Sequence, residues 1–251
     1  MDMEKQLRGF VTITDYVVRK LLMSKRLYIA LIIMVATVAI MAYATTQEIS
    51  RLDGGTELLD VFVLSFWMPV LAMIYGSSLV RDEMDDKSIT SVVTSPMDRM
   101  VAYTAYYLGL VISVSLILLL ILTAGFLSFY GAEGLDGAAW GIYGSMAALV
   151  VIGSFVYSAL FVMVSVLISK PIFFGLFYAF IWEALIGSVP GNIKLLAVKH
   201  YIRSIGAHWI DHGLLSTYEA TSMGDSATVL VVFTVITFIM GAIVFRQTEF
   251  T

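Results

Sequence analysis

The sequence predicts an all-α integral membrane protein with six transmembrane helices. Of its 251 residues, 59% are hydrophobic and only 14% are charged, whereas soluble domains carry about 25% charged residues. Several apolar runs reach about 18 residues, the length that a helix needs to cross the roughly 30 Å hydrocarbon core of a bilayer. Lipid admits only helices and closed barrels, and these runs are too long for strands. The chain contains no cysteine, which excludes disulfides and thiolate metal sites.

The positions of the apolar runs define the predicted spans within a single transmembrane domain, residues 1–251. The spans cover residues 27–44, 58–80, 102–129, 138–168, 171–189 and 227–245. Pro171 suits the start of the fifth helix, because a residue in the first turn has no intrahelical hydrogen bond to donate. The segment 190–225 then forms an outer region between the last two spans.

The distribution of Lys and Arg predicts that both termini are cytoplasmic in a multi-pass protein of the cell membrane. With the N-terminus inside, 11 of the 15 Lys and Arg residues fall in inner segments and four in outer loops. The four outer residues are Arg51, Lys194, Lys199 and Arg203.

Residues 6–26, which precede the first span, have the pattern of an amphipathic helix. Apolar residues such as Phe10, Val17 and Leu21 recur at helical spacing, while Arg8 and Arg19 lie on the opposite face. This pattern is typical of a helix in the membrane interface with its basic side toward anionic lipid headgroups. The alternative is a cytoplasmic approach to the first span.

A charged segment, "RDEMDDKSITSVVTSPMDRM", separates the second and third spans. Asp85 or Asp86 is a good N-cap, and Ser95 with Asp98 forms an S-x-x-D capping box around Pro96. The segment is therefore predicted to form a short helix, about 86–94, and a sharp turn into the third span. Its first seven residues hold four acids and two bases, and anionic headgroups repel such a patch. This favours a protein partner over lipid, the alternative being a solvated connector.

The pattern "RDEMDDKSITSVVTSPMDRMVAYTAYYLG" resembles the signature of type-2 ABC exporter permeases, in which an acidic residue leads into a short cytoplasmic coupling helix. The amphipathic helix at 6–26, as an elbow helix, and the six spans agree with that family. "FIWEALIGSVPG" is similar to its outer re-entrant region. The resemblance implies a separate ABC ATPase subunit that grips residues 82–94, and a second permease copy as homodimer or heterodimer. The contact candidates are Asp82, Glu83, Asp86, Lys87 and Ser91.

The chain lacks the G-x-x-x-x-G-K-[ST] motif that cradles nucleotide phosphates. We therefore expect it not to be an enzyme, and we assign no catalytic residue and no cofactor to it. ATP and Mg²⁺ would belong to the partner subunit. Membrane lipid is an expected partner and nucleic acid is not.

Glu183 is an acidic residue about 12 positions into the fifth span, roughly 18 Å along the helix. A charge at the centre of a membrane helix costs about 2.5–3.5 kcal/mol on insertion scales. One interpretation places Glu183 on the transport path or at an outer gate. The other gives it a structural role, capping the backbone of a helix break near Gly187, Pro190 and Gly191.

The outer region holds "HWIDH", which puts His208 and His212 one helical turn apart. Asp211 or Glu219 would have to complete a metal site, and without an H-E-x-x-H motif we expect no metal. Two alternative functions remain: a stand-alone secondary transporter or channel using Glu183, and an intramembrane enzyme using the histidines. The enzyme lacks a matched nucleophile, base and oxyanion donor. The substrate is not evident from the sequence.

Overall fold

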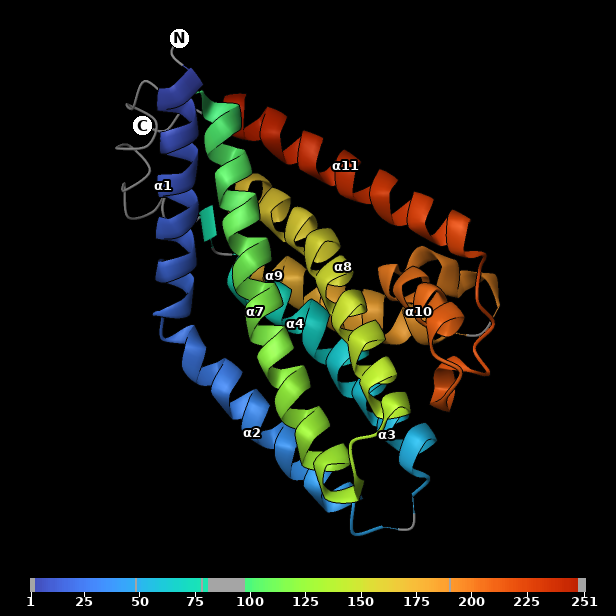
Figure 1. Cartoon of the computed structure of the whole chain (residues 1–251). Helices are drawn as coiled ribbons and strands as arrows, with labels where there is room; N and C mark the ends of the chain where they lie inside the picture. Colours follow the sequence, from blue (N-terminus) through green and yellow to red (C-terminus); the bar gives the residue numbers. More distant parts are fainter. Residues whose placement is uncertain (1–2, 48, 78, 81–97, 190, 248–251) are drawn as a thin grey trace.

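The computed structural model describes residues 3–47, 49–77, 79–80, 98–189 and 191–247, and every regular element in these ranges is helical (Figure 1). The chain begins with α1 (Met3–Leu22) and α2 (Arg26–Ala44). We count α2 as the first long apolar helix. The second consists of α3 (Arg51–Leu59), η1 (Asp60–Trp67) and α4 (Met68–Gly76), which follow one another without a break. The segment 82–94, predicted as a coupling helix, lies outside the described residues.

The second half of the chain contains three more long helices and a set of short ones. The long helices are α7 (Arg99–Glu133), α8 (Gly137–Leu167) and α11 (Met223–Gln247). Between α8 and α11 lie α9 (Pro171–Leu176), η2 (Phe177–Leu185), η3 (Ile186–Ser188), η4 (Asn192–Leu196), α10 (Val198–Trp209) and η5 (Gly213–Leu215).

Five of these helices are long and apolar enough to cross a membrane, which makes the chain an all-α, multi-pass membrane protein. They are Arg26–Ala44, Arg51–Gly76, Arg99–Gly131, Gly137–Leu167 and Met223–Gln247. The predicted span at 171–189 corresponds to a shorter apolar helix, Pro171–Leu185. It ends early because the chain tightens into the 3₁₀ turn η3 and then reaches Gly191, whose φ of 86° is a conformation that glycine adopts readily.

The long helices run between two ends of the bundle: α2 and α7 in one direction, and the α3–η1–α4 helix, α8 and α11 in the other (Figure 1). At one end, which we call the terminal end, the backbone N–H of Asp98 donates to Gln6 and the guanidinium of Arg99 donates to the carbonyl of Arg246. The starts of α1 and α7 and the end of α11 therefore lie together (Figure 1). At the opposite end, the loop end, Arg51 pairs with Asp136 at 3.2 Å, joining the starts of α3 and α8.

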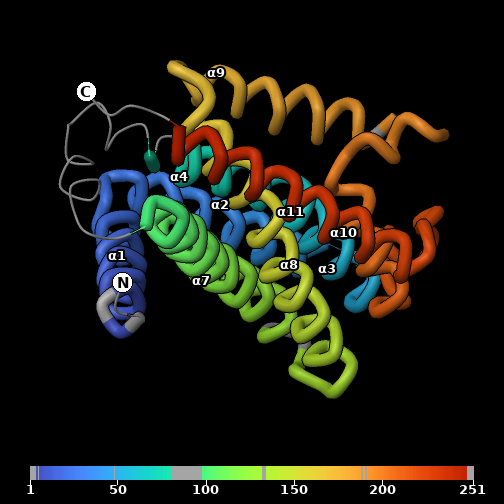
Figure 2. Tube along the Cα trace, turned by 90° about the horizontal axis from the view of Figure 1, so that it is seen from above, coloured from blue at the N-terminus to red at the C-terminus, as the bar shows by residue number. Residues whose placement is uncertain are grey.

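The segment from α9 onwards runs along the flank of the bundle opposite α7 (Figure 2), and the backbone N–H of Gly213 in η5 donates to Asp53 in α3, which places this part of the chain at the loop end. There the short elements from η3 to η5 gather around α10, next to the start of α11. This region corresponds to the predicted outer region, 190–225. That this flank segment forms a sixth span stays a prediction.

The amphipathic helix predicted at 6–26 is α1, which begins a few residues earlier and ends at Leu22. It packs lengthwise against α7: Gln6 meets Asp98, and the buried Val17 meets Gly109, where a Cβ would lie 2.6 Å from Val17 Cγ1. The two helices thus run parallel over some three turns. The interfacial placement of α1 stays a prediction.

The start of α7 differs from the predicted capping box. Asp98 is the N-cap of α7, and its Oδ1 accepts a hydrogen bond of 2.9 Å from the backbone N–H of Met100. The same residue that was expected to complete a box with Ser95 therefore caps the helix itself, because a carboxylate there satisfies an N–H without an intrahelical partner.

Candidate functional site

Two π-helical segments interrupt the apolar helices near the loop end, and each holds a buried carboxylate. Asp60 is the first residue of η1, and Glu183 lies in η2; the side chains of both are fully buried. The segments touch through Phe66 and Phe180, whose ring centroids are 5.9 Å apart. π-Helical turns inserted into α-helices are frequent at functional sites, and a buried acid inside an apolar helix of a membrane protein is a functional candidate.

Glu183 caps the N-terminus of α10. Its Oε1 accepts hydrogen bonds from the Tyr178 hydroxyl at 2.7 Å and the Val198 N–H at 3.1 Å. Its Oε2 accepts from the Lys199 N–H at 3.0 Å. The first N–H groups of a helix have no intrahelical acceptor, and the helix dipole favours a negative group there. Ala197 at the N-cap has no polar side-chain atom, so Glu183 supplies the cap from 15 residues upstream.

Glu183 caps backbone N–H groups, as the structural interpretation expected, but it does so at another place in the chain. The carboxylate was expected to cap a break near Gly187 to Gly191, and it instead holds the first turn of a helix that begins at Val198. Tyr157 of α8 is close enough to interact electrostatically with the same carboxylate. Glu183 therefore joins η2, α8 and α10 at one point.

The side chain of Lys199 is buried between the two acids. Burial lowers the pKa of Lys199, and Arg203 one turn away lowers it further, while Glu183 and Asp60 act in the opposite direction. The stem of Lys199 passes against Gly187, where a Cβ would lie 2.9 Å from Lys199 Cε. Glycine at position 187 thus makes room for the lysine.

Arg203 forms a salt bridge with Asp60. Its Nε lies 3.0 Å from Oδ1 and 2.9 Å from Oδ2 of the carboxylate, and Nη2 also donates to Oδ2. Only 14% of the Arg203 side chain is exposed, and none of the Asp60 side chain. The guanidinium also lies over the ring of Tyr218, 5.4 Å from its centroid. This pair ties α10 to the second long helix, as Glu183 ties it to η2.

The histidines of the outer region contact separate partners. His200 is buried, with Nδ1 2.7 Å from the Tyr218 hydroxyl and Nε2 2.8 Å from Thr221 Oγ1. Burial lowers the pKa of His200, and Lys194 lowers it further. His208 contacts the carbonyl of Ser204, and His212 contacts Asp53. Among the described residues, His, Asp and Glu side chains form no group of three that could hold a metal.

A polar pocket of about 460 Å³ opens beside α10. Arg203 and Tyr218 line it together with Lys194 and Glu219, which pair at 2.7 Å. The Lys194 ammonium holds the pKa of the exposed Glu219 below its usual value, through a hydrogen bond and its charge. The pocket can admit water and small polar groups to the edge of the α10 cluster, defined as Asp60, Glu183, Lys199, His200 and Arg203.

Of the predicted site residues, only Glu183 lies in this cluster. Asp82, Glu83, Asp86, Lys87 and Ser91 lie outside the described residues, so their role as ATPase contacts stays a prediction. The sequence interpretation missed Asp60 and its partner Arg203. An acid two residues inside the predicted span 58–80 was the available signal, since intramembrane acids are rare and usually paired.

Comparison with known proteins gives this chain no family: no family model matches it, and no curated protein matches it. The fold and the site define it as an all-helical, multi-pass membrane protein with a buried ionic cluster at one end of the bundle.

Proposed function

We propose that this chain is the permease subunit of an ABC exporter, forming the export pathway and driven by a separate ATPase subunit. The observation that carries the proposal is the position of the charged segment 82–94 between the second and third long helices. A docked motor at this point would act directly on α7.

The packing of α7 supports this use. The helix has 35 residues, roughly 52 Å at 1.5 Å per residue, and extends through the whole bundle. Its first turn contacts α1 through Gln6 and the end of α11 through Arg246. A displacement of the segment that precedes Asp98 would therefore reach three helices at once. ATP and Mg²⁺ bind in the partner, and two copies of each subunit complete the transporter.

The proposed orientation puts the terminal end in the cytoplasm and the α10 cluster outside. The Lys and Arg count supports it, and so does the placement of the start of α1 and the end of α11 at the same end of the bundle (Figure 1). In this orientation Pro171–Leu185 is the sixth, incomplete span, and the elements from η3 to η5 form an outer cap that re-enters the bundle. Glu183 and the α10 cluster then lie at an outer gate of the export pathway.

The alternative, a stand-alone transporter or channel that binds a proton or cation at Glu183, gains less support. Three donors already engage the Glu183 carboxylate, and its oxygens hold the start of α10. Such a carboxylate is suited to fixing the position of α10 more than to exchanging a cation with solvent.

The test is co-purification. A tagged chain is solubilised from its native membranes, and the bound P-loop ATPase is identified by nucleotide photolabelling and its turnover measured. Replacing Glu83 and Lys87 by glutamine together, or Ser91 by proline, should abolish ATPase binding or uncouple its turnover from transport. The matched control replaces Glu219 and Lys194 by glutamine, an ion pair at the loop end, and should retain binding.

Two outcomes contradict the proposal. If the wild-type chain captures no ATPase, the permease assignment is wrong. If both segment variants bind and couple like wild type, the segment is only a connector. Orientation is measured separately, since the chain has no native cysteine: an impermeant thiol reagent added to intact cells should label Ser216→Cys and spare Ser91→Cys.

A further inference from the structure

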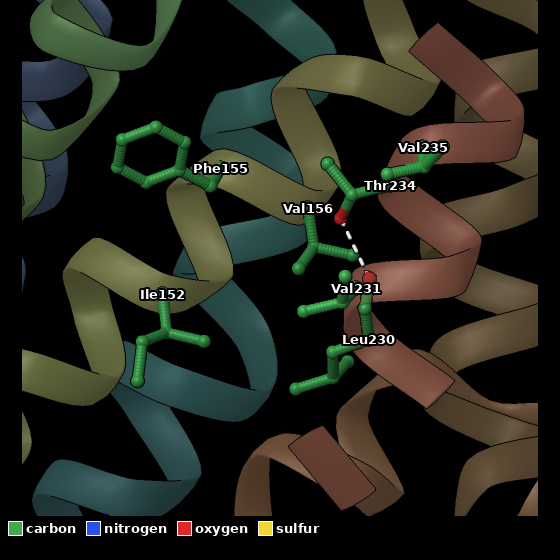
Figure 3. A pocket seen from close by; sticks show the side chains of 7 residues that line it. All are labelled: Ile152, Phe155, Val156, Leu230, Val231, Thr234 and Val235. Carbon is green, nitrogen blue, oxygen red and sulfur yellow. Dashed lines mark hydrogen bonds between the residues drawn. The ribbon is translucent and has the colours of Figure 1, made fainter. Parts of the chain in front are cut away.

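A recess opens on the membrane-facing side of the bundle where α11 crosses α8. It has a volume of about 280 Å³, and its walls are apolar, in contrast to the charged α10 cluster (Figure 3). The walls are Ile152, Phe155 and Val156 from α8, and Leu230, Val231, Thr234 and Val235 from α11. We call this recess the α8–α11 groove.

The groove lies on the outer side of the seam between α8 and α11, two helices that pack against each other, and the buried residues of α11 include Leu230 and Thr237. Toward the terminal end, Gly241 brings the helices together: a Cβ there would lie 3.0 Å from Met163 Cα and 2.0 Å from the Tyr103 hydroxyl. Toward the loop end, Ser226 and Leu230 of α11 are buried, and this helix also packs against α10. The valines between these anchors are exposed, Val231 by 62% and Val235 by 48%.

The groove lies at a depth that hydrocarbon occupies. Its α11 residues are seven to twelve positions from Met223, roughly 10–18 Å along the helix, and its α8 residues are near the middle of that helix. Only 28% of the apolar window of α11 is buried within the chain, so the rest of the chain leaves most of this helix uncovered, as for a helix that faces lipid. The groove is continuous with that lipid-facing surface.

Its walls exclude a polar occupant. Thr234 carries the only side-chain oxygen of the lining residues, and its hydroxyl donates at 2.7 Å to the carbonyl of Leu230, as Figure 3 shows. A water molecule needs two to four polar partners. An empty recess, in turn, forfeits the dispersion contacts of the atoms around it. The occupant must therefore be apolar, and a recess of about 280 Å³ is too small to take a helix, whose diameter is about 10–12 Å.

We propose that the α8–α11 groove binds one acyl chain of a membrane phospholipid as a resident ligand. The chain enters along the exposed valines of α11 and fills the space between the two anchor points. Moving an acyl chain from the surrounding lipid into the groove gains no hydrophobic free energy. The chain is therefore retained by van der Waals packing against the groove walls. This inference rests on the membrane-spanning helices alone and is independent of the proposed ABC function.

The first test compares two neighbouring residues of α11. Val235 lines the groove and Ile236 does not, yet they are 48% and 51% exposed. Native mass spectrometry of the purified chain in mild detergent should show one retained phospholipid per chain in wild type and in Ile236→Trp. Val235→Trp fills the groove with an indole and should lose that phospholipid.

The second test locates the lipid without altering the groove. Wild type in phosphatidylcholine vesicles that carry a diazirine in the middle of one acyl chain should, after irradiation, be labelled preferentially on peptides containing 152–156 and 230–235. Equal phospholipid retention in the two tryptophan variants, or labelling spread evenly over all lipid-facing helices, would overturn the proposal. A Val235→Cys chain that oxidises to a disulfide-linked dimer in vesicles would assign the groove to a second copy instead.

Discussion

The two ends of the bundle are held together by different chemistry. At the loop end, the buried charged side chains of Asp60, Glu183 and Lys199 and the mostly buried Arg203 join three elements. At the terminal end, α11 comes close to α7 and α8 at Gly241, against Tyr103 and Met163, and exposed hydrogen bonds from Asp98 to Gln6 and from Arg99 to Arg246 join the helix ends. The difference follows from the helix formed by α9 and η2, which ends at Leu185 and is followed by the short elements η3 to η5. Short elements expose backbone N–H groups that long helices satisfy internally, and a buried backbone group must find a partner.

The ionic end should be the more sensitive of the two to a single substitution. Arg203→Met removes one partner of a buried pair and leaves the Asp60 carboxylate uncompensated, which typically costs about 3–5 kcal/mol. We expect a loss of that size in the free energy of unfolding, measured by denaturant titration in detergent micelles. The double variant Asp60→Leu with Arg203→Met should recover much of it, because it buries no lone charge. A double variant no more stable than Arg203→Met would mean that the pair itself supplies the stability.

Glu183→Gln tests the cap of α10. The amide can still accept from one or two donors, but its NH₂ group faces an N–H that the carboxylate oxygen had satisfied. A buried donor without a partner costs about 1–3 kcal/mol, so we expect a loss in that range, with faster amide exchange at Val198 and Lys199. The same substitution at the exposed Glu219 serves as the control and should leave unfolding unchanged. Unaltered exchange at the start of α10 would contradict the capping role.

Gly241→Ala tests the close helix packing at the terminal end. The new Cβ would meet the Tyr103 hydroxyl and the backbone of Met163, and overpacking typically costs about 1–3 kcal/mol. Alanine offsets part of this through its helix propensity, so we expect a net loss of about 1–2 kcal/mol. Gly144→Ala, on α8 with open space around its Cβ position, should stabilise the protein slightly. Opposite signs for the two substitutions would confirm that close approach at Gly241 positions α11.

The smallest effect concerns pH. The pKa of His200 is lowered from 6.5 by burial and by Lys194, so the folded state takes up its proton less readily than the unfolded state. The stability that neutral His200 contributes is therefore fully present above about pH 6.5 and declines as the pH falls below that value. Wild type should lose stability on acidification in this range, and His200→Gln should lose less. The measurement is the unfolding midpoint between pH 5 and 7.5, with His212→Gln as the control; equal slopes in all three would contradict the assignment.

Local sequence patterns were sufficient for the membrane class and for most of the helices. An apolar run of helical length has one stable arrangement in lipid, whatever its neighbours are. This explains why five of the predicted spans coincide with long helices and why the amphipathic pattern at 6–26 coincides with α1. The position of Glu183 within an apolar run also marked it as a residue that needs partners, and it has three donors; its depth in the membrane stays a prediction.

The identity of those partners was decided by the tertiary structure. Glu183 bonds to backbone groups 15 and 16 positions away, and Arg203 bonds to Asp60 across 143 positions. Neither separation leaves a periodic trace in the sequence. The π-helical segments η1 and η2 are likewise invisible to a pattern based on 3.6 residues per turn. The sequence by itself thus determined that an acid within an apolar run needs hydrogen-bond or ionic partners, because lipid cannot solvate it. Only the packing of α10 against both segments determined how.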